Sequence, residues 1–364
     1  MPRAAVIVAP GGPVELREFP TPALEPGAVL LDTILSEVCG TDVHLLHGRL
    51  ADTPYPLIPG HISVGRVAQT NGPVTDIEGR DIAVGDTVTF LDVHGTCHNC
   101  WYCLVAKAST RCPSRRVYGI TYGADEGLLG GWSEQIHLKP GVHIVPLPEG
   151  LSPRTYMAGG CALPTALHAV DRAQIRLGDS VAVQGSGPVG LMVTALARLS
   201  GAGAIIVLGA PADRLETALE LGGDQVIDVD EIGPADRPAL VRDLTHGRGS
   251  DVTIECAGVP GAVREGLRMT RDAGTYVIVG QYTDAGEVTI SPHWDLNRKH
   301  LDVRACWGID LSHLHRAVQV LARHRDRFPW DQMVSAAYPL AQAAQALRDV
   351  EERRVVKAVI DPHA

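Results

Sequence analysis

Four cysteines close together in the sequence are the most specific sign of chemistry in this chain. They follow the pattern C-x2-C-x2-C-x8-C at Cys97, Cys100, Cys103 and Cys112. Neither a helix nor a strand requires sulfur at this spacing, whereas four thiolates on short loops can enclose one tetrahedral zinc ion. The alternative is a pair of disulfides in a secreted protein. The N-terminal segment disfavours that alternative, because its apolar run is too short for a secretion signal and ends in proline and glycine.

A second set of metal-binding residue types is dispersed along the chain. Cys39 precedes Gly-Thr-Asp, His61 lies in PGHISVG, and Cys161 lies in GGCALP. Taken singly, a buried cysteine is usually a small core residue. Together, two cysteines and one histidine match a known catalytic zinc set, in which three protein ligands leave a fourth position open. The sequence therefore predicts two zinc ions per chain, one structural and one catalytic.

A glycine-rich turn indicates dinucleotide binding. Gly185, Gly187 and Gly190 form G-x-G-x-x-G, and Pro188 and Val189 lie between the last two glycines. A buried apolar run precedes the turn and a helical pattern follows it, which is the context that the motif requires. The N-terminus of that helix offers free N–H groups to a pyrophosphate. We expect these five residues to bind NAD or NADP.

The choice between NAD and NADP stays open. About twenty residues after the glycine turn, NAD enzymes of this fold place a carboxylate for the ribose hydroxyls, but this chain has Gly209 there. The missing acid removes a repulsion against a 2′-phosphate, yet no cation follows immediately to attract one. Arg214 is the nearest cation, and its side chain could serve either cofactor.

The elements expected around these residues divide the chain into two parts. Residues 1–150 contain short β-like runs separated by Gly and Pro, as in a compact antiparallel barrel. Beyond them, buried apolar runs at 204–210, 251–258 and 274–281 alternate with helical segments, as does the run before the glycine turn. Strands that alternate with helices predict a doubly wound parallel sheet.

Composition limits the classes of function. The 364 residues suffice for two domains, and the fractions of 45% hydrophobic and 20% charged residues are those of an ordinary globular protein. A net charge of −10 disfavours nucleic-acid binding, and no apolar run reaches the ~18–20 residues of a membrane span. Eight cysteines, four of them clustered, indicate a reducing compartment, and we expect a cytoplasmic protein.

Several motifs together resemble those of the zinc-dependent medium-chain alcohol dehydrogenases. They are CGTDVH, PGHISVG, the GDTV turn at 85–88, the four-cysteine lobe, GGWSEQ at 130–135, the glycine turn, and NRKHLDVRACWG at 297–308. The match runs over nearly the whole chain. It implies an α/β protein with a GroES-like β-barrel catalytic domain at 1–160, completed by 307–364, and a Rossmann domain at 161–306.

The resemblance also implies roles for individual residues. The dispersed cysteines and histidine correspond to catalytic zinc ligands, and the clustered cysteines to structural ones. Thr41 corresponds to the hydroxyl residue that touches the substrate alcohol, and His44 to the outer end of a proton relay. Lys357 falls where the family often has a cation near the pyrophosphate, and Thr165 is assigned to the cofactor site.

Three departures from the family pattern stand out. Ile62 follows the ligand histidine, where the family usually has a Glu that is thought to assist ligand exchange at the zinc. Cys161 stands where the polyol and threonine dehydrogenase branches often have Glu, which makes the ligand set richer in thiolate. The last gap in the structural cluster is eight residues instead of the usual seven, a difference that a loop can absorb.

The implied reaction is hydride transfer between a small-molecule alcohol or carbonyl compound and NAD(P). Val93 is small, which favours a bulky or secondary alcohol. His94 either binds a polar substituent or is a solvated loop residue, and Trp132 and Trp307 either line the pocket or pack in the core. Two alternatives are reduction of a C=C or C=N bond on the same scaffold, and a nucleotide-binding protein without turnover.

One segment of the chain predicts self-association. The segment LDVRAC at 301–306 has the alternating pattern of an edge strand. An exposed edge invites pairing with a second copy, which two-fold symmetry satisfies. We expect a homodimer or a homotetramer.

Overall fold

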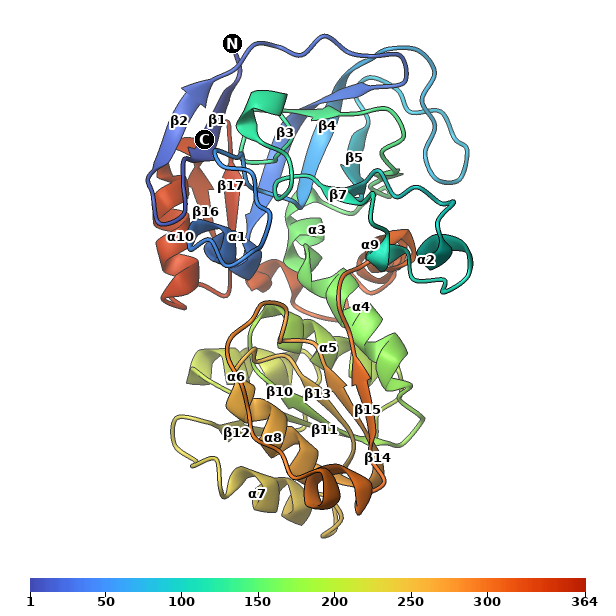
Figure 1. The fold of residues 1–364 in the computed structure, drawn as a ribbon, viewed down its shortest axis with the longest axis vertical. Coiled ribbons are helices and arrows are strands. Elements are labelled where there is room, and N and C mark those ends of the chain that lie inside the picture. The colour runs from blue at the N-terminus through green and yellow to red at the C-terminus, as the bar shows by residue number, and fades with distance from the viewer. The chain divides into compact units, whose positions relative to one another are not determined.

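The computed structural model describes residues 1–364, and the chain divides into two compact units (Figure 1). The first unit comprises Met1–Cys161, Asp310–Arg325 and Trp330–Ala364, and the second comprises Ala162–Ile309 and Asp326–Pro329. The sequence-based boundaries differ by a few residues, since Cys161 groups with the first unit, and residues 307–309 and Asp326–Pro329 group with the second. All three dispersed metal-ligand candidates therefore belong to one unit.

The first unit is built on a seven-stranded sheet. Its strands are β3 (Val29–Val38), β4 (Ser63–Thr70), β5 (Thr87–Phe90), β8 (Gln135–Leu138), β9 (Ile144–Pro146), β16 (Val334–Pro339) and β17 (Lys357–Asp361). The order is β16-β17-β3-β4-β5-β9, with β8 also paired to β3, and only β16 and β17 run parallel. Two small antiparallel pairs complete the strands: β1 (Arg3–Ile7) with β2 (Val14–Glu18), and β6 (Val93–His94) with β7 (Arg116–Val117).

The first unit also contains short helices. They are α1 (Gly40–Leu46), α2 (Trp101–Leu104), α3 (Pro153–Gly159), α9 (Leu311–Arg323) and α10 (Ala343–Glu351), with 3₁₀ turns η1 (Ser109–Arg111), η2 (Ala124–Glu126), η4 (Trp330–Met333) and η5 (Leu340–Gln342). One apolar core joins side chains of β17 and α10, such as Ile360 and Leu347, to Val38 at the end of β3. This core fixes the end of β3, where the metal-ligand candidates begin.

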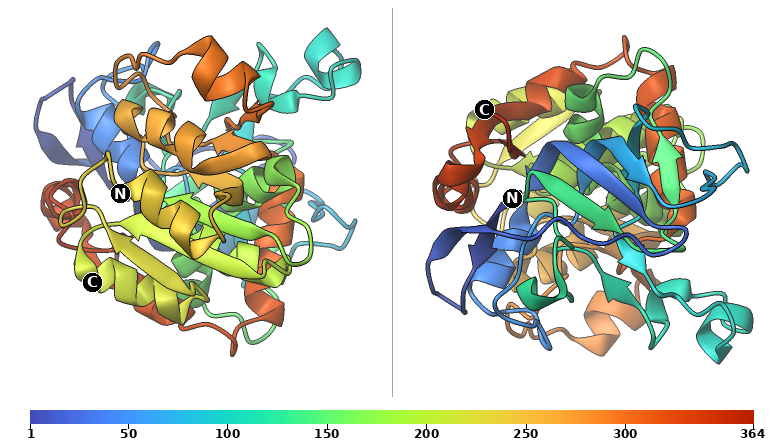
Figure 2. Two further views of the ribbon diagram at one scale, coloured as in Figure 1. Left: turned by 90° about the horizontal axis from the view of Figure 1, so that it is seen from below. Right: turned by 90° about the horizontal axis from the view of Figure 1, so that it is seen from above.

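The second unit is a six-stranded parallel sheet flanked by helices, which Figure 2 shows on both faces of the sheet. The strands are β10 (Ser180–Gln184), β11 (Ala204–Gly209), β12 (Gln225–Asp228), β13 (Ser250–Glu255), β14 (Thr270–Ile278) and β15 (Asp302–Ala305). The helices are α4 (Ala162–Ala173), α5 (Pro188–Leu199), α6 (Ala212–Glu220), α7 (Arg237–Leu244) and α8 (Pro260–Met269), with a π-helical turn η3 (Pro292–Asn297).

The order of the parallel strands, β12-β11-β10-β13-β14-β15, confirms the predicted doubly wound sheet. Chain order reverses direction at β10, whose neighbours are β11 and β13. In such sheets ligands bind at the carboxyl ends of the strands beside this switch point. The glycine turn follows β10 at that edge.

None of the helices has both the length and the apolar character of a membrane-spanning segment. The longest of them, α9, has 13 residues.

Candidate functional site

The three dispersed ligand candidates converge in the first unit. Cys39 follows β3 and precedes α1, His61 lies two residues before β4, and Cys161 follows α3. Their ligand atoms all lie within 4.8 Å of one another, and Cys39 Sγ is 4.0 Å from His61 Nε2. Around a tetrahedral zinc with bonds of about 2.0–2.3 Å, ligand atoms are roughly 3.3–3.8 Å apart. Two thiols and one imidazole at these distances fit a zinc ion with one position left open.

A buried carboxylate joins the two loops that hold Cys39 and His61. Asp42, in the first turn of α1, accepts the backbone N–H of Cys39 at 2.9 Å and that of Gly60 at 3.4 Å. Its side chain is fully buried, and this burial, together with the Cys39 thiol, raises the pKa of Asp42 well above its usual value. Asp42 therefore fixes the separation of Cys39 and His61 through their backbone.

The ligand atoms strongly affect one another's ionisation. Contact with Cys161, and then with His61, holds the pKa of Cys39 well below its ordinary value. Burial alone would lower the pKa of His61, but the neighbouring Cys39 thiolate raises it to about 10. Without metal, the cluster thus favours a thiolate paired with an imidazolium. Because a metal ion binds neutral imidazole, binding must release that proton.

Thr41 and His44 lie one helical turn apart on α1, and residues three apart share a helix face. Both are half-buried. Burial, and then the positive charge of Arg49, lower the pKa of His44 below its ordinary 6.5. The imidazole is therefore mainly neutral at pH 7 and able to accept a proton.

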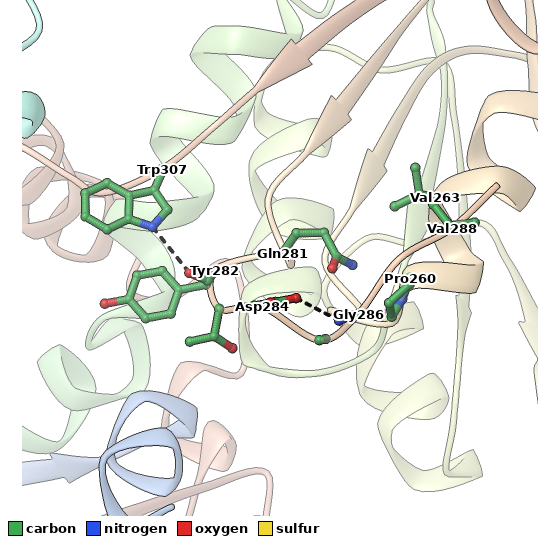
Figure 3. A pocket seen from close by; sticks show the side chains of 10 residues that line it. Pro260, Val263, Gln281, Tyr282, Asp284, Gly286, Val288 and Trp307 are labelled. Atoms are coloured by element: carbon green, nitrogen blue, oxygen red, sulfur yellow. Dashed lines mark hydrogen bonds between the residues drawn. The ribbon is translucent and has the colours of Figure 1, made fainter. Parts of the chain in front are cut away.

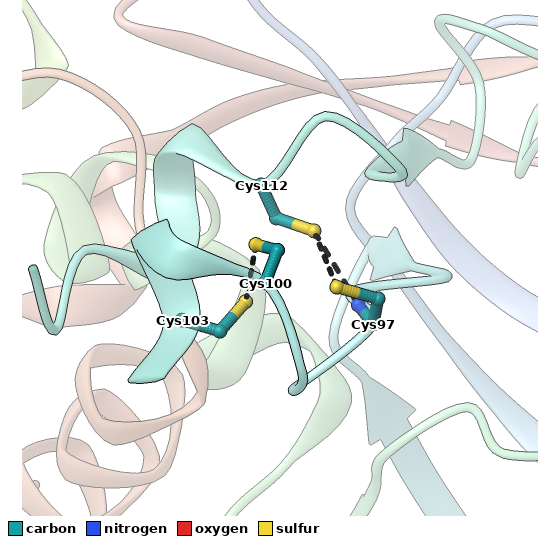
Figure 4. Close-up of side chains that lie close together, drawn as sticks. All are labelled: Cys97, Cys100, Cys103 and Cys112. Atoms are coloured by element: carbon teal, nitrogen blue, oxygen red, sulfur yellow. Dashed lines mark hydrogen bonds between the residues drawn. The ribbon is translucent and has the colours of Figure 1, made fainter. Parts of the chain in front are cut away.

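The four clustered cysteines also converge, in the lobe formed by residues 97–112 (Figure 4). The Sγ atoms of Cys97 and Cys112 are 3.5 Å apart, as are those of Cys100 and Cys103. A disulfide requires about 2.05 Å, and none of the eight cysteines forms one. The lobe therefore has the geometry of a four-thiolate zinc site.

Local structure explains how the longer gap in this cluster is absorbed. Cys100 caps the start of α2, the 3₁₀ turn η1 occupies part of the eight-residue gap, and Cys112 follows η1 directly. Burial raises the pKa of Cys112, but backbone N–H groups of Cys97 and Ser114 overcome this effect and bring it to about 6. Such N–H donors stabilise the thiolate form that binds metal.

The glycine turn has the predicted context in the second unit. Gly185 and Ser186 follow β10, Gly187 is the N-cap of α5, and Pro188 occupies its first turn. Val189 is half-buried on α5, and Gly190 is buried there. The free N–H groups at the start of α5 are thus placed to bind a pyrophosphate.

The structure gives a steric reason for glycine at position 209. A Cβ atom there would lie 2.3 Å from Ser186 Oγ and 2.8 Å from the Ser186 backbone nitrogen. Ser186 is held in that place by donating to the Ala210 carbonyl at 3.0 Å. An aspartate at 209 would require the glycine turn itself to shift, which accounts for the missing carboxylate.

The remaining predicted cofactor residues lie in different settings. Thr165 is half-buried on α4, and Arg214 is buried on α6, with 8% of its surface exposed. Lys357 is the first residue of β17 in the first unit. It is 1% exposed, and its Nζ lies 2.8 Å from Glu37 Oε1, beside the ligand Cys161. Its ion pair with Glu37, whose carboxylate contacts the ligand candidate Cys161, is a feature that the sequence did not predict.

The structure also places the three residues of the first unit that were candidates for the substrate pocket. Val93 is buried, and His94 accepts or donates a hydrogen bond with Tyr122 Oη at 2.7 Å, so His94 is not a solvated loop residue. Trp132 is fully buried and donates from Nε1 to the Glu37 carbonyl at 3.0 Å. Trp132 therefore belongs to the core.

A pocket of about 450 Å³ lies in the second unit, between the start of α8 and the segment after β14 (Figure 3). Its lining includes Pro260, Val263, Gln281, Tyr282, Asp284 and Trp307. The Trp307 ring stacks on Tyr282, with centroids 5.9 Å apart. Since α8 and this segment follow the carboxyl ends of β13 and β14, the pocket belongs to the same sheet edge as the glycine turn.

Sequence reasoning missed three acidic residues around the metal ligands. Glu37 and Asp42 contact ligand backbone groups, and Asp92 is buried near His61, where burial raises the pKa of its carboxyl group. A signal was available for Glu37, because a charged residue stands out in the apolar run VLLDTILSEVC.

Comparisons with known proteins agree with this arrangement. Residues 25–149 match the family model "Alcohol dehydrogenase GroES-like domain", and residues 188–323 match "Zinc-binding dehydrogenase". The chain is 33% identical over 361 residues to 5-exo-hydroxycamphor dehydrogenase from Pseudomonas putida, covering 99% of this chain and 98% of that protein.

Solved structures of dehydrogenases are similar to this chain over nearly its whole length. Alcohol dehydrogenase from Thermotoga maritima superposes with a TM-score of 0.94 at 30% identity, over 99% of both chains. A zinc-binding dehydrogenase from Sinorhizobium meliloti, described as putative and bound to NADP, superposes with a TM-score of 0.85 at 28% identity, over 100% of this chain and 99% of that one.

Proposed function

We propose that this chain, which belongs to the zinc-dependent medium-chain dehydrogenase/reductase family, oxidises a secondary or bulky alcohol by hydride transfer to NAD(P), or runs the reverse reaction. Membership in the family makes it a zinc- and NAD(P)-dependent alcohol oxidoreductase. The convergence of Cys39, His61 and Cys161, whose ligand atoms all lie within 4.8 Å of one another, supports the proposal most directly.

The residues fit both bound groups. Cys39, His61 and Cys161 would hold a zinc ion, which acts as a Lewis acid on the substrate oxygen when bound. The glycine turn would hold the pyrophosphate of NAD(P), whose nicotinamide accepts the hydride. The protein itself supplies orientation, a dry environment and a route for the proton.

We assign that route to α1. The Thr41 hydroxyl accepts the proton from the substrate hydroxyl and passes it outward, and His44, one turn further along, delivers it to solvent. The half-buried position of both residues supports the assignment. Histidine suits the outer position because it exchanges protons near neutral pH.

The first prediction concerns His44. His44→Gln should lower kcat for alcohol oxidation by up to about 100-fold near pH 7, the low edge for a general base, and added imidazole buffer should restore part of the rate. Because the pKa of His44 is lowered, the wild-type rate should stay level through neutral pH and fall only below about pH 6.5, as His44 becomes protonated. The measurement is the pH profile of kcat with and without buffer. A mutant profile identical to the wild type would remove His44 from the route.

The substrate class follows from the small residue Val93 and from one relative. Val93 is buried, in the segment just before the four-cysteine lobe, and we infer that its small side chain leaves room for a branched carbinol carbon. The relative from Pseudomonas putida is named for hydroxycamphor, a cyclic secondary alcohol. Both features support a bulky secondary alcohol as substrate.

The proposal is tested by a screen of cyclic, aromatic and aliphatic alcohols with NAD and with NADP. We expect the highest kcat/KM for cyclic secondary alcohols, and a preference between cofactors below about a thousandfold, since Gly209 neither attracts nor repels the 2′-phosphate. Turnover of enones or imines without any alcohol oxidation would favour the alternative reduction chemistry. Nucleotide binding without turnover of any substrate would reject an enzyme.

A second prediction concerns assembly. β15 is an edge strand of the parallel sheet, and Val303 within it is 42% exposed. We propose that β15 pairs with its own copy to form a homodimer, or a tetramer of such dimers, since an unpaired edge is a template for pairing. Light scattering should show at least a dimer at micromolar concentration, and Val303→Pro should shift the protein toward a monomer. A wild-type monomer would contradict the proposal.

We also propose a cytoplasmic location. The absence of disulfides among eight cysteines supports a reducing compartment.

A further inference from the structure

A buried ion pair lies directly against one of the metal ligands. Glu37 is near the end of β3 and Lys357 is the first residue of β17, and these strands are antiparallel neighbours. Both residues are 1% exposed, and Lys357 Nζ lies 2.8 Å from Glu37 Oε1. Taking two charges out of water is costly, and apolar residues often replace such pairs without loss of stability. Fold stability alone therefore does not explain the pair.

Both oxygens of this carboxylate contact Cys161. Oε2 accepts the Cys161 backbone N–H at 2.6 Å, and Oε1 lies 3.4 Å from Cys161 Sγ. The Lys357 ammonium also donates to the Gly159 carbonyl at 3.2 Å, so it holds the end of α3 just before the ligand. The pair thus fixes both the backbone and the sulfur of Cys161.

Gly160 allows this close approach. Its φ of +42° is unfavourable for other residues, and a Cβ atom would lie 2.1 Å from Glu37 Oε2 and 2.6 Å from Lys357 Nζ. The chain therefore turns from α3 to Cys161 over the ion pair with no intervening side chain. The contact between Glu37 and Cys161 requires glycine at this position.

The two ligand cysteines are held in similar ways, with one difference. The backbone N–H of Cys39 also ends on a buried carboxylate, that of Asp42. Only at Cys161 does the carboxylate also face the sulfur, and only there does an ammonium group contact the carboxylate oxygen that faces the sulfur. Ile62, which follows His61, is buried and uncharged, so it supplies no carboxylate at the third ligand. A carboxylate in contact with a thiolate needs such a cation, because like charges at this separation repel strongly in a buried site.

We propose that Glu37 and Lys357 are positioning residues for the catalytic metal: Glu37 orients Cys161 toward the metal, and Lys357 neutralises the Glu37 carboxylate beside the sulfur. This inference rests on the proposed function, since it presumes a metal held by Cys39, His61 and Cys161. Residues behind a metal ligand typically change metal affinity by about 10–100-fold when they are replaced.

The test follows zinc loss from the purified holoenzyme under a chelator, by elemental analysis at timed intervals. Glu37→Gln and Lys357→Met should each lose one zinc about 10–100-fold faster than the wild type, while the second zinc, in the four-cysteine lobe, is lost at the wild-type rate. The double variant Glu37→Gln/Lys357→Met should lose it more slowly than Lys357→Met alone, because no isolated charge remains. Cobalt substitution should show weakened sulfur-to-metal absorption in both single variants.

A matched control is Glu265→Gln. Glu265 forms a half-buried ion pair with Arg237 at 3.1 Å in the second unit, and its replacement should leave both zinc ions in place. Wild-type zinc loss and cobalt spectra in all three Glu37 and Lys357 variants would overturn the inference. Loss of both zinc ions together with a collapse in melting temperature would also overturn it, because the pair would then serve the fold alone. A wild-type protein that holds no zinc outside the lobe would instead reject the proposed function.

Discussion

Cys39→Ser is expected to lower kcat/KM for alcohol oxidation by at least about a thousandfold. A bound Lewis acid contributes several kcal/mol to transition-state stabilisation, and about 4 kcal/mol corresponds to that factor. A buried serine hydroxyl does not ionise at neutral pH, so it cannot replace the thiolate whose pKa the cluster lowers. Zinc content should fall from two ions per chain to one, because only one of the two ligand groups is changed.

The measurement combines steady-state kinetics with elemental analysis, and Cys306→Ser is the control. Cys306 is buried in the second unit and outside both ligand groups, so its replacement should keep both metals and most activity. A Cys39→Ser enzyme with activity within tenfold of the wild type would show that the reaction does not depend on this ligand group.

Cys100→Ser should differ from Cys39→Ser in both respects: the lobe should lose much of its stability, and the catalytic metal should be retained. Neither α2 nor η1 contains a buried residue, and Trp101 is 62% exposed. The lobe therefore has no apolar core of its own, and the metal must supply its folding free energy. In small zinc domains this binding is worth on the order of 10 kcal/mol.

We expect the melting temperature of Cys100→Ser to fall by about 5–10 °C, the shift that a loss of a few kcal/mol produces. Limited proteolysis should cut within residues 97–112 in this variant and not in Cys39→Ser, which serves as its partner control. Unchanged melting with both zinc ions present would mean that the lobe does not depend on Cys100.

Features with a local cause could be predicted from the sequence. The four-cysteine spacing, the glycine turn and the apolar strands of the second unit each arise within about twenty residues, so their periodicity is sufficient to identify them. The edge position of β15 also follows from its sequence pattern. The dispersed ligands were recognised by resemblance to a family, and their convergence came only with the structure.

Features that depend on distant contacts could not be predicted. Glu37 and Lys357 are 320 positions apart, and only the pairing of β3 with β17 brings them together. The resemblance alone places Lys357 near a phosphate, whereas the structure pairs its ammonium with Glu37, whose carboxylate contacts Cys161. Gly209 was interpreted through its missing charge, whereas the structure shows that Ser186 occupies the space for a side chain.

The separation of Glu37 from Lys357 along the chain also sets an order for assembly during synthesis. The lobe closes a loop of 16 residues, from Cys97 to Cys112, so its zinc site can form while the ribosome is still making the second unit. The catalytic site needs β17, which follows the whole of the second unit in the chain. A nascent chain can therefore acquire its structural metal early, whereas the catalytic site is complete only once β17 has been made. Premature termination between Cys112 and Lys357 leaves a protein that retains the ligands of the lobe and lacks an intact catalytic centre.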